Sequence, residues 1–252
     1  MATALIKGLI LSGKVSPKNI AVFDTDAEKL NAMAESSGIV PSSSAPAVEA
    51  AADIVVLAVK PNVMPVVLDE LEGVDGKIYI SIAAGISLET LECGIGKDKK
   101  IIRTMPNTPA FVGCGMTVIT PNKNIAADEL KAIEDLLSGI GDTVVLDEKY
   151  MNAAIALHGS SPAYIYMLID AMADSGVKYG IPKTLALKLA AKAVEGSAKM
   201  VLETGIHPGQ LKDNVCSPGG TTIAAVCELE KTGFKSSVQS AIDACVDKAN
   251  NM

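Results

Sequence analysis

Short apolar runs rich in β-branched residues recur through the first 148 residues and alternate with helical patterns. The runs cover residues 19–24, 53–59, 77–82, 100–105, 116–120 and 143–146. Patterns typical of helices lie between them, including residues 27–36, 46–52 and 127–137, and residues 1–13 indicate a short packed helix. Nearly continuous apolar strands separated by helices predict a mainly parallel sheet that is covered on both faces.

The strand signals stop at about residue 149. Helical patterns then cover residues 162–179, 182–203, 208–214, 221–230 and 234–250. Three of these begin with a proline, which suits the first turn of a helix. The pattern therefore predicts an α/β chain with a Rossmann-like, doubly wound domain over residues 1–148 and an all-helical domain over residues 149–252.

Composition and charge exclude several classes of function. The 252 residues are 49% hydrophobic and only 3% aromatic, with no Trp, which favours an aliphatic core of helices and parallel strands. A net charge of −7 argues against nucleic acid and anionic membranes as partners. The two histidines exclude a multi-histidine metal centre, so we expect no metal. The five cysteines lack CxxC spacing, and no apolar run is long enough for a membrane span, so we expect free thiols and a cytoplasmic protein.

The first predicted strand ends in Asp24, whose carboxylate could accept hydrogen bonds from an adenosine ribose. A glycine fingerprint should lie about 20 residues earlier. Counting back reaches Met1 and Ala2, so we expect the sequence to begin inside the fingerprint, with the first strand and the glycine loop absent. An acidic residue at a strand end is also common by chance.

The next three strands each end in a turn of possible function. The turns are AVKP at residues 58–61, SIAAG at residues 81–85 and MPNTP at residues 105–109. In an open α/β sheet, ligands bind beyond the carboxyl ends of the strands. The two prolines of the last turn stiffen it, so we expect Asn107 and Thr108 to project outward as hydrogen-bonding groups. From the residues alone, an ordinary turn with Lys60 in solvent is the favoured interpretation of AVKP. A plain tight turn explains SIAAG equally well, and proline-rich connections such as MPNTP also occur simply as turns.

The helical region carries two further candidates. DNVCSPGGTT at residues 213–222 is a glycine-rich stretch that opens a helix, which suits a small anion or an ordinary capped turn. His158, within LHGSSPAY at residues 157–164, is either a general acid or a structural side chain at a helix junction.

In this order and spacing, AVKP, SIAAGI, MPNTP, SSPAY and DNVCSPGGTT resemble the pyrroline-5-carboxylate reductase family over essentially the whole chain. The resemblance implies reduction of 1-pyrroline-5-carboxylate, a cyclic imino acid, to L-proline with NADPH or NADH. It also implies a homodimer built by the C-terminal helices, or a decamer of such dimers.

The family's contacts carry over to matching positions of this sequence. Those that match cofactor contacts are Met1, Ala58, Val59, Lys60, Pro61, Ile82, Ala83, Ala84, Asn107 and Asn214. Those that match substrate contacts are Glu148, Thr221 and Thr222, with Ser217 and Gly220 in the same cradle. Asp24 is a further cofactor candidate, and Thr222 and His158 are the catalytic candidates. The resemblance implies that the nicotinamide C4 hydride passes to the imine carbon of a substrate held by its carboxylate, mainly through positioning and desolvation.

Three departures from the family pattern change the expectations. HGSSPAY stands in place of the common SGSGPAY. Asp24 and Thr25 stand where members that prefer NADPH often offer Ser or Arg to the 2′-phosphate, so NADH should be better tolerated than usual. Without the glycine loop, we expect weaker NAD(P)H binding than in a version extended by a strand and such a loop.

Two other functions remain open from the residues. A dehydrogenase of the β-hydroxyacid type usually has a catalytic lysine near the domain boundary, and here Lys149 is the nearby candidate, on the wrong side of HGSSPAY. A catalytically impaired oligomeric scaffold is the non-enzymatic alternative.

Overall fold

The computed structural model describes residues 1–251, which form two compact units. The first unit contains residues 1–159 and 248–251, and the second contains residues 160–247. The end of the last helix belongs to the first unit, where Asn152 Nδ2 donates a hydrogen bond of 2.9 Å to Asn250 Oδ1. The units therefore divide 11 residues beyond the boundary predicted after residue 148 (159 − 148).

A five-stranded sheet forms the centre of the first unit, in the order β3-β4-β5-β6-β7. Its strands are β3 (Ile54–Leu57), β4 (Ile78–Ser81), β5 (Lys100–Met105), β6 (Gly115–Pro121) and β7 (Gly141–Val145). β3, β4 and β5 are parallel, β6 is antiparallel to β5, and β7 is parallel to β6. The predicted mainly parallel sheet is confirmed. The reversal occurs because residues 106–114 are too few for a crossover, which needs a dozen or more residues.

A separate two-stranded parallel sheet contains β1 (Ala21–Val22) and β2 (Val40–Pro41). The strand predicted over residues 19–24 is therefore much shorter. Asn19 lies in the 3₁₀ turn η1 (Pro17–Asn19), and Asp24 lies beyond the ladder. The pattern did not predict β2. A ladder of two residues leaves almost no period by which a strand is recognised.

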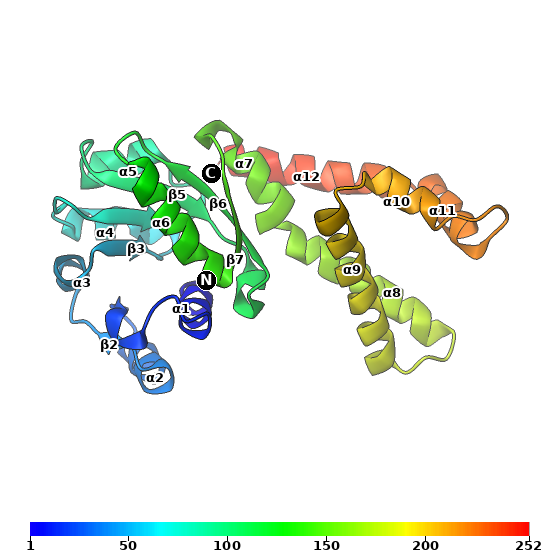
Figure 1. Ribbon diagram of the computed structural model, residues 1–252, viewed down its shortest axis with the longest axis horizontal. Helices are drawn as coiled ribbons and strands as arrows, with labels where there is room; N and C mark the ends of the chain where they lie inside the picture. The colour runs from blue at the N-terminus through cyan, green and yellow to red at the C-terminus, as the bar shows by residue number, and fades with distance from the viewer. Residues whose placement is uncertain (252) are drawn as a thin grey trace. The chain divides into compact units, whose positions relative to one another are not determined.

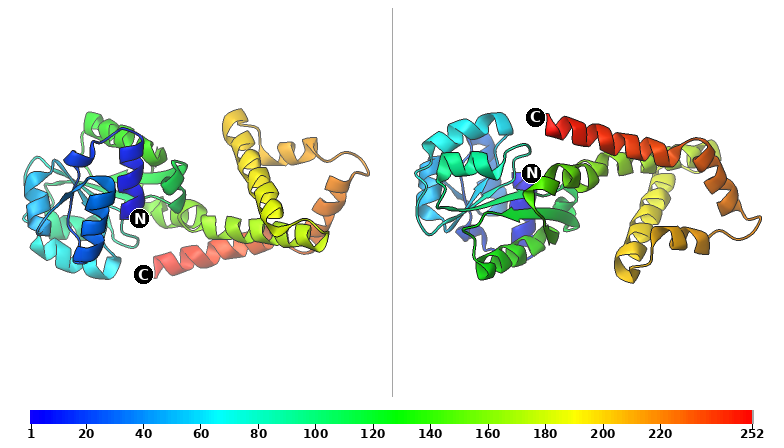
Figure 2. Two further views of the ribbon diagram at one scale, coloured as in Figure 1. Left: turned by 90° about the horizontal axis from the view of Figure 1, so that it is seen from below. Right: turned by 90° about the horizontal axis from the view of Figure 1, so that it is seen from above.

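Helices cover both faces of the large sheet (Figure 1, Figure 2). The helices of the first unit are α1 (Ala2–Leu11), α2 (Ala27–Ser37), α3 (Ala45–Ala51), α4 (Met64–Glu70), α5 (Leu88–Ile95), α6 (Ala127–Leu137) and α7 (Met151–Ala154). Short 3₁₀ turns are η2 (Pro61–Val63), η3 (Thr108–Val112), η4 (Ser138–Ile140) and η5 (Glu148–Tyr150), and a π-helical turn, η6, covers Ile155–Gly159.

The two faces of the sheet bury separate apolar clusters. Leu5 of α1 and Ile133 of α6 pack with Ile102 of β5 on one face. Leu68 of α4 and Leu91 of α5 pack with the neighbouring strand residue Ile101 on the other face. Successive strand residues point to opposite faces. Burying each of these apolar side chains contributes roughly 1.5–3 kcal/mol. A slip of one residue would move them to the other face, so the two clusters fix the register of the strands.

The regular secondary structure of the second unit is entirely helical in its described residues, with short connections between the helices. The helices are α8 (Ser161–Lys178), α9 (Lys183–Thr204), α10 (Pro208–Asn214), α11 (Thr221–Lys231) and most of α12 (Phe234–Asn250). α8 and α9 approach closely, since a Cβ placed at Gly176 would lie 3.1 Å from the Cβ of Ala186. Ala186 and Ala190 are buried.

Little else is buried in the second unit when one copy of the chain is considered. Of the described residues 160–247, only Ala173, Ala186 and Ala190 are buried. Its exposed large apolar side chains include Ile165, Tyr166, Met167, Met172, Leu185, Leu189, Met200, Leu202, Leu229, Phe234 and Val238. Monomeric proteins rarely expose so much apolar surface, and it marks an interaction surface. Within residues 1–251, no helix is both long enough and apolar enough to cross a bilayer.

Candidate active site

The turns predicted to bind a cofactor leave the same edge of the sheet. In the parallel ladder of β3, β4 and β5, Leu57 is paired with Ser81 and Ser81 with Arg103. Ala58–Pro61, Ile82–Ala84 and Asn107 therefore all follow carboxyl ends of adjacent parallel strands. This edge is where open α/β sheets bind their ligands, and small residues there let a ligand approach the backbone.

The loop after β4 is held by local hydrogen bonds. Ile82 N donates to Leu57 O at 3.2 Å, and the N–H of the buried Ala83 donates to Ser81 Oγ at 3.3 Å. The loop then passes through Gly85, whose φ of +75° favours glycine, and ends where Ser87 caps α5. Ala83 and Ala84 thus have a defined position.

Glu148 is the one predicted substrate residue in the first unit, and it has two partners there. Its Oε1 accepts hydrogen bonds from Leu88 N and from Arg103 Nη1, each at 2.8 Å. Its side chain is one-third exposed. Arg103 was not among the residues predicted from the sequence. The available signal was the chain's single arginine inside an otherwise apolar strand.

The prediction that the side chain of Asn107 projects outward is wrong. Asn107 is buried; its Nδ2 donates to His158 O at 3.0 Å, and its Oδ1 accepts from Met116 N at 2.9 Å. The amide group thus ties the end of β5 to β6 and to the π-helical turn. Thr108 is exposed, as expected. Any contact of Asn107 with a cofactor would therefore have to come from its backbone.

The ring of His158 lies between two backbone carbonyl groups. Nδ1 is 2.5 Å from Ala154 O, and Nε2 is 2.8 Å from Met105 O. Both ring nitrogens thus have protein partners at the junction between β5 and α7. These contacts favour the structural interpretation of His158 over a role as general acid.

At the start of the chain, Asp24 is paired rather than free. Its Oδ2 lies 2.6 Å from Lys29 Nζ, and its Oδ1 accepts a hydrogen bond from Asp26 N. The hydrogen bond from Lys29 holds the pKa of Asp24 below its ordinary value. Met1 is the N-cap of α1 and is not capped by a side chain, so the first N–H groups of this helix are open to an anion.

In the second unit, the glycine-rich stretch forms a tight turn into α11. Gly219 has φ +70°, and Gly220 N donates to Ser217 O at 3.0 Å. Gly220 is the N-cap of α11, without a side-chain cap, and Thr221 and Thr222 are exposed in its first turn. Open N–H groups beside two hydroxyls suit a carboxylate. Asn214 lies at the end of α10, where its Oδ1 accepts from Gln210 Nε2 at 2.8 Å.

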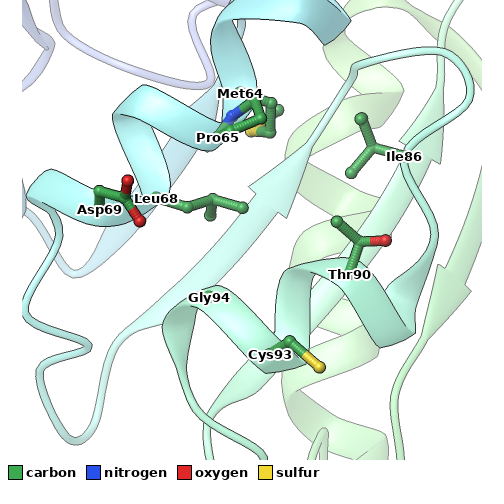
Figure 3. A pocket seen from close by; sticks show the side chains of 8 residues that line it. All are labelled: Met64, Pro65, Leu68, Asp69, Ile86, Thr90, Cys93 and Gly94. Atoms are coloured by element: carbon green, nitrogen blue, oxygen red, sulfur yellow. The ribbon is translucent and has the colours of Figure 1, made fainter.

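A cavity of about 260 Å³ lies between α4 and α5, and none of the predicted site residues lines it (Figure 3). Its lining is mostly apolar and includes Met64, Leu68 and Ile86. Thr90 is among the lining residues, and its hydroxyl is hydrogen-bonded to Ser87 Oγ at 2.9 Å. The cavity lacks the donors that a dinucleotide phosphate needs. Within the described residues there is also no cluster of His, Cys, Asp and Glu that could hold a metal ion.

Comparison with known proteins decides the family. The family model for pyrroline-5-carboxylate reductase dimerisation matches residues 148–252, and the model for coenzyme F420-dependent NADP oxidoreductases matches residues 1–85. The pyrroline-5-carboxylate reductase of Escherichia coli is 45% identical over the whole of this chain and 94% of its own length. The chain belongs to the pyrroline-5-carboxylate reductase family.

Other members of the family are similar over the same extent. The enzyme of Arabidopsis thaliana is 39% identical, over 100% of this chain and 92% of its own. The structure of the Streptococcus pyogenes enzyme superimposes with a TM-score of 0.90 at 37% identity, over 100% of this chain and 95% of that one. The Plasmodium falciparum enzyme, solved with NADP bound, gives a TM-score of 0.89 at 32% identity, over 98% and 92%.

These findings confirm the family and the fold inferred from the motifs, and with them an oxidoreductase that uses NAD(P)H and carries a dimerisation domain. They do not support a dehydrogenase of the β-hydroxyacid type. Lys149, the candidate for that chemistry, is exposed and paired with Asp147.

Proposed function

We propose that this chain reduces 1-pyrroline-5-carboxylate to L-proline with NADPH or NADH. The observation that carries the proposal is identity of 45% along the whole chain with a pyrroline-5-carboxylate reductase. The turns after β3 and β4 and the uncapped start of α11 support the proposal, because they provide groups that suit a dinucleotide and a carboxylate.

The first unit would hold the dinucleotide at the carboxyl edge of β3, β4 and β5. Residues Ala58–Pro61 and Ile82–Ala84 provide backbone groups and small side chains at this edge, and the uncapped start of α1 at Met1 provides donors for phosphate oxygens. When bound, the nicotinamide supplies the hydride that reduces the C=N bond. Asp24 would accept a hydrogen bond from a ribose hydroxyl.

The start of α11 would hold the carboxylate of the substrate. Its N–H groups lack a side-chain cap, and the hydroxyls of Thr221 and Thr222 can add two further hydrogen bonds. Ser217 and Gly220 shape the turn that leaves these donors free. Asn214 would contact the cofactor from the end of α10.

Glu148 would face the cationic end of the substrate. A protonated imine carries a positive charge at nitrogen. A nearby carboxylate stabilises that charge and accepts a hydrogen bond from the imine N–H. The imine is already activated by its proton, so the site needs no separate general acid. The absence of a need for a general acid agrees with the position of His158, whose ring contacts two backbone carbonyl groups. We therefore assign His158 the role of positioning the end of β5. Thr222 keeps the direct role in orienting the reacting bond.

The dimerisation domain pairs two copies of the chain, and its exposed apolar helix faces supply the surface. We also propose that dimers assemble into a decamer, as the resemblance to the family implies. The five cysteines, all free thiols, are consistent with a location in the cytoplasm, because disulfides persist in oxidising compartments.

Isotope transfer tests the reaction directly. NADPH that carries deuterium at both C4 positions should transfer one deuterium to the former imine carbon of L-proline, detected by mass spectrometry. Unlabelled proline would exclude direct hydride transfer. No proline at all would favour the impaired scaffold.

A further inference from the structure

Arg103 occupies an unusual position for an arginine. It lies on β5 between Ile102 and Thr104, and its side chain is only 6% exposed. It is also the single arginine in the sequence. Burying a guanidinium is costly unless its donors are paired, so a buried strand position normally takes an apolar residue.

The hydrogen bonds of Arg103 do not minimise that cost. Nη1 donates to Glu148 Oε1 at 2.8 Å, whereas the buried Nε–H has no partner in the described part of the chain. An orphaned buried donor needs an explanation other than stability. The placement of the guanidinium satisfies its contact with Glu148 and leaves a second donor unpaired.

The hydrogen bonds of Glu148 are also unevenly distributed, because they all go to one of its two carboxylate oxygens. Arg103 and the backbone N–H of Leu88 both donate to Oε1, and within residues 1–251 nothing donates a hydrogen bond to Oε2. Leu88 is the first residue of α5, directly after the cap Ser87, so one carboxylate oxygen links β5 to the helix that follows the cofactor loop. The second oxygen remains available to another cation.

We propose that Arg103 is a positioning residue of the reductase. It fixes the Glu148 carboxylate by Oε1, so that Oε2 is presented to the N–H of the protonated imine, and it ties this orientation to the start of α5. The proposal rests on the substrate role of Glu148 under the proposed function.

A second ion pair on the same strand provides a matched control. Lys100 pairs with Glu129 of α6, and the alternation of the strand places Lys100 and Arg103 on opposite faces. Lys100→Met and Glu129→Gln therefore remove a comparable pair of β5 without touching Glu148.

The kinetic test is a double-mutant cycle of Arg103→Met and Glu148→Gln with their combination. Removing one hydrogen bond to a charged group should lower kcat/KM for the imine about 10- to 100-fold in each single variant. If Arg103 acts through Glu148, the kcat/KM of the double variant should be no lower than that of the less active single variant. The NADPH dissociation constant should stay within about 2-fold, and the Lys100 and Glu129 variants should keep the kcat/KM of the original chain. Arg103→Lys, which keeps the charge but lacks the fork of the guanidinium, should recover only part of the activity.

Hydrogen–deuterium exchange tests the geometry independently of the reaction. In Arg103→Met, amides at the start of α5, including Leu88, should exchange faster because Glu148 loses its anchor, whereas Lys100→Met should leave them unchanged. Unchanged exchange at Leu88 in Arg103→Met would overturn the positioning claim, whatever the kinetics.

Other results also overturn the proposal. Full kcat/KM in Arg103→Met, or losses that multiply in the double variant, would mean that Arg103 does not act through Glu148. Full kcat/KM in Glu148→Gln would remove the substrate role on which the proposal rests, while the reductase activity itself would stand. Absence of imine reduction by the unaltered chain would instead contradict the proposed function, and exchange at Leu88 would still decide the geometry.

Discussion

Lys29 Nζ lies 2.6 Å from Asp24 Oδ2, so the acid that follows β1 is paired with a cation five residues later. The hydrogen bond to Asp24 in turn raises the pKa of Lys29. The sequence suggested that Asp24 repels the 2′-phosphate of NADPH. The pair should reduce this repulsion, so we expect Lys29 to contribute to the choice between NADPH and NADH.

Lys29→Met should therefore shift the chain toward NADH. The unpaired Asp24 carboxylate would lower kcat/KM with NADPH relative to NADH about 2- to 5-fold, the size expected for an exposed charge pair. Asp24→Asn should shift the ratio the other way. Lys131→Met, on the distant helix α6, removes the same charge as a control. Equal ratios in all four proteins would show that the pair plays no part in cofactor choice.

The stability of the first unit should depend on Glu49. This buried carboxylate accepts hydrogen bonds from the Tyr79 hydroxyl at 2.6 Å and from the N–H groups of Glu72 and Gly73. Burial alone would raise the pKa of Glu49, but these hydrogen bonds outweigh it and hold the pKa below its ordinary value. Burial, together with the hydrogen bond to Glu49, raises the pKa of Tyr79.

A carboxyl whose pKa is lower in the folded state contributes stability above its unfolded pKa of about 4.3 and loses it as pH falls through the folded pKa. Glu49→Gln should lower the free energy of unfolding at pH 7 by about 1–3 kcal/mol and flatten its fall below about pH 5. Urea unfolding at several pH values measures both. The exposed Glu70→Gln is the control, and an unchanged pH dependence in Glu49→Gln would contradict the assignment.

Thr222→Ala should weaken the use of the imine far more than the binding of the cofactor. It removes one hydroxyl from the start of α11, which corresponds to roughly 1.5–3 kcal/mol, or about 10- to 100-fold in kcat/KM. Steady-state rates with varied imine and a separate NADPH titration distinguish the two effects. Thr184→Ala on α9 makes the same change at another exposed position. A kcat/KM equal to that of the unaltered chain would contradict the assignment of the carboxylate site to the start of α11.

Leu185 and Leu189 are about half exposed and lie one turn apart on α9. Replacing both with Glu places two charges in an apolar surface that a second copy should bury, so light scattering should report loss of the dimer. Lys188→Glu on the same helix should leave the dimer intact. If both proteins kept the dimer, the interface would have to lie elsewhere.

Much of the fold could be predicted because apolar strands, helical periodicity and prolines at helix starts gave strong local signals. The bounds of β5, α6, α10 and α12 were predicted to the residue. The apolar pattern of β6 does not show its direction; the signal that was missed is the short connection over residues 106–114, which is too few residues for a parallel crossover. The short ladder of β1 and β2 also gave no clear signal.

The site was harder to predict, because its side chains bond over long separations. Motif positions located the turns at the sheet edge. The amide of Asn107 was expected to project outward, but its partners lie 9 and 51 residues further along the chain. The partner of Arg103 lies 45 residues away, and no local pattern connects the two.

The most direct test of the account is the stoichiometry of imine reduction by the purified chain. We predict that NADPH is oxidised only when 1-pyrroline-5-carboxylate is present, and that one L-proline forms for each NADPH consumed. Glu148→Gln should lower the rate at limiting imine, and Lys100→Met should not. A folded dimer that consumes no NADPH with this imine, or that consumes it without forming proline, would contradict the account.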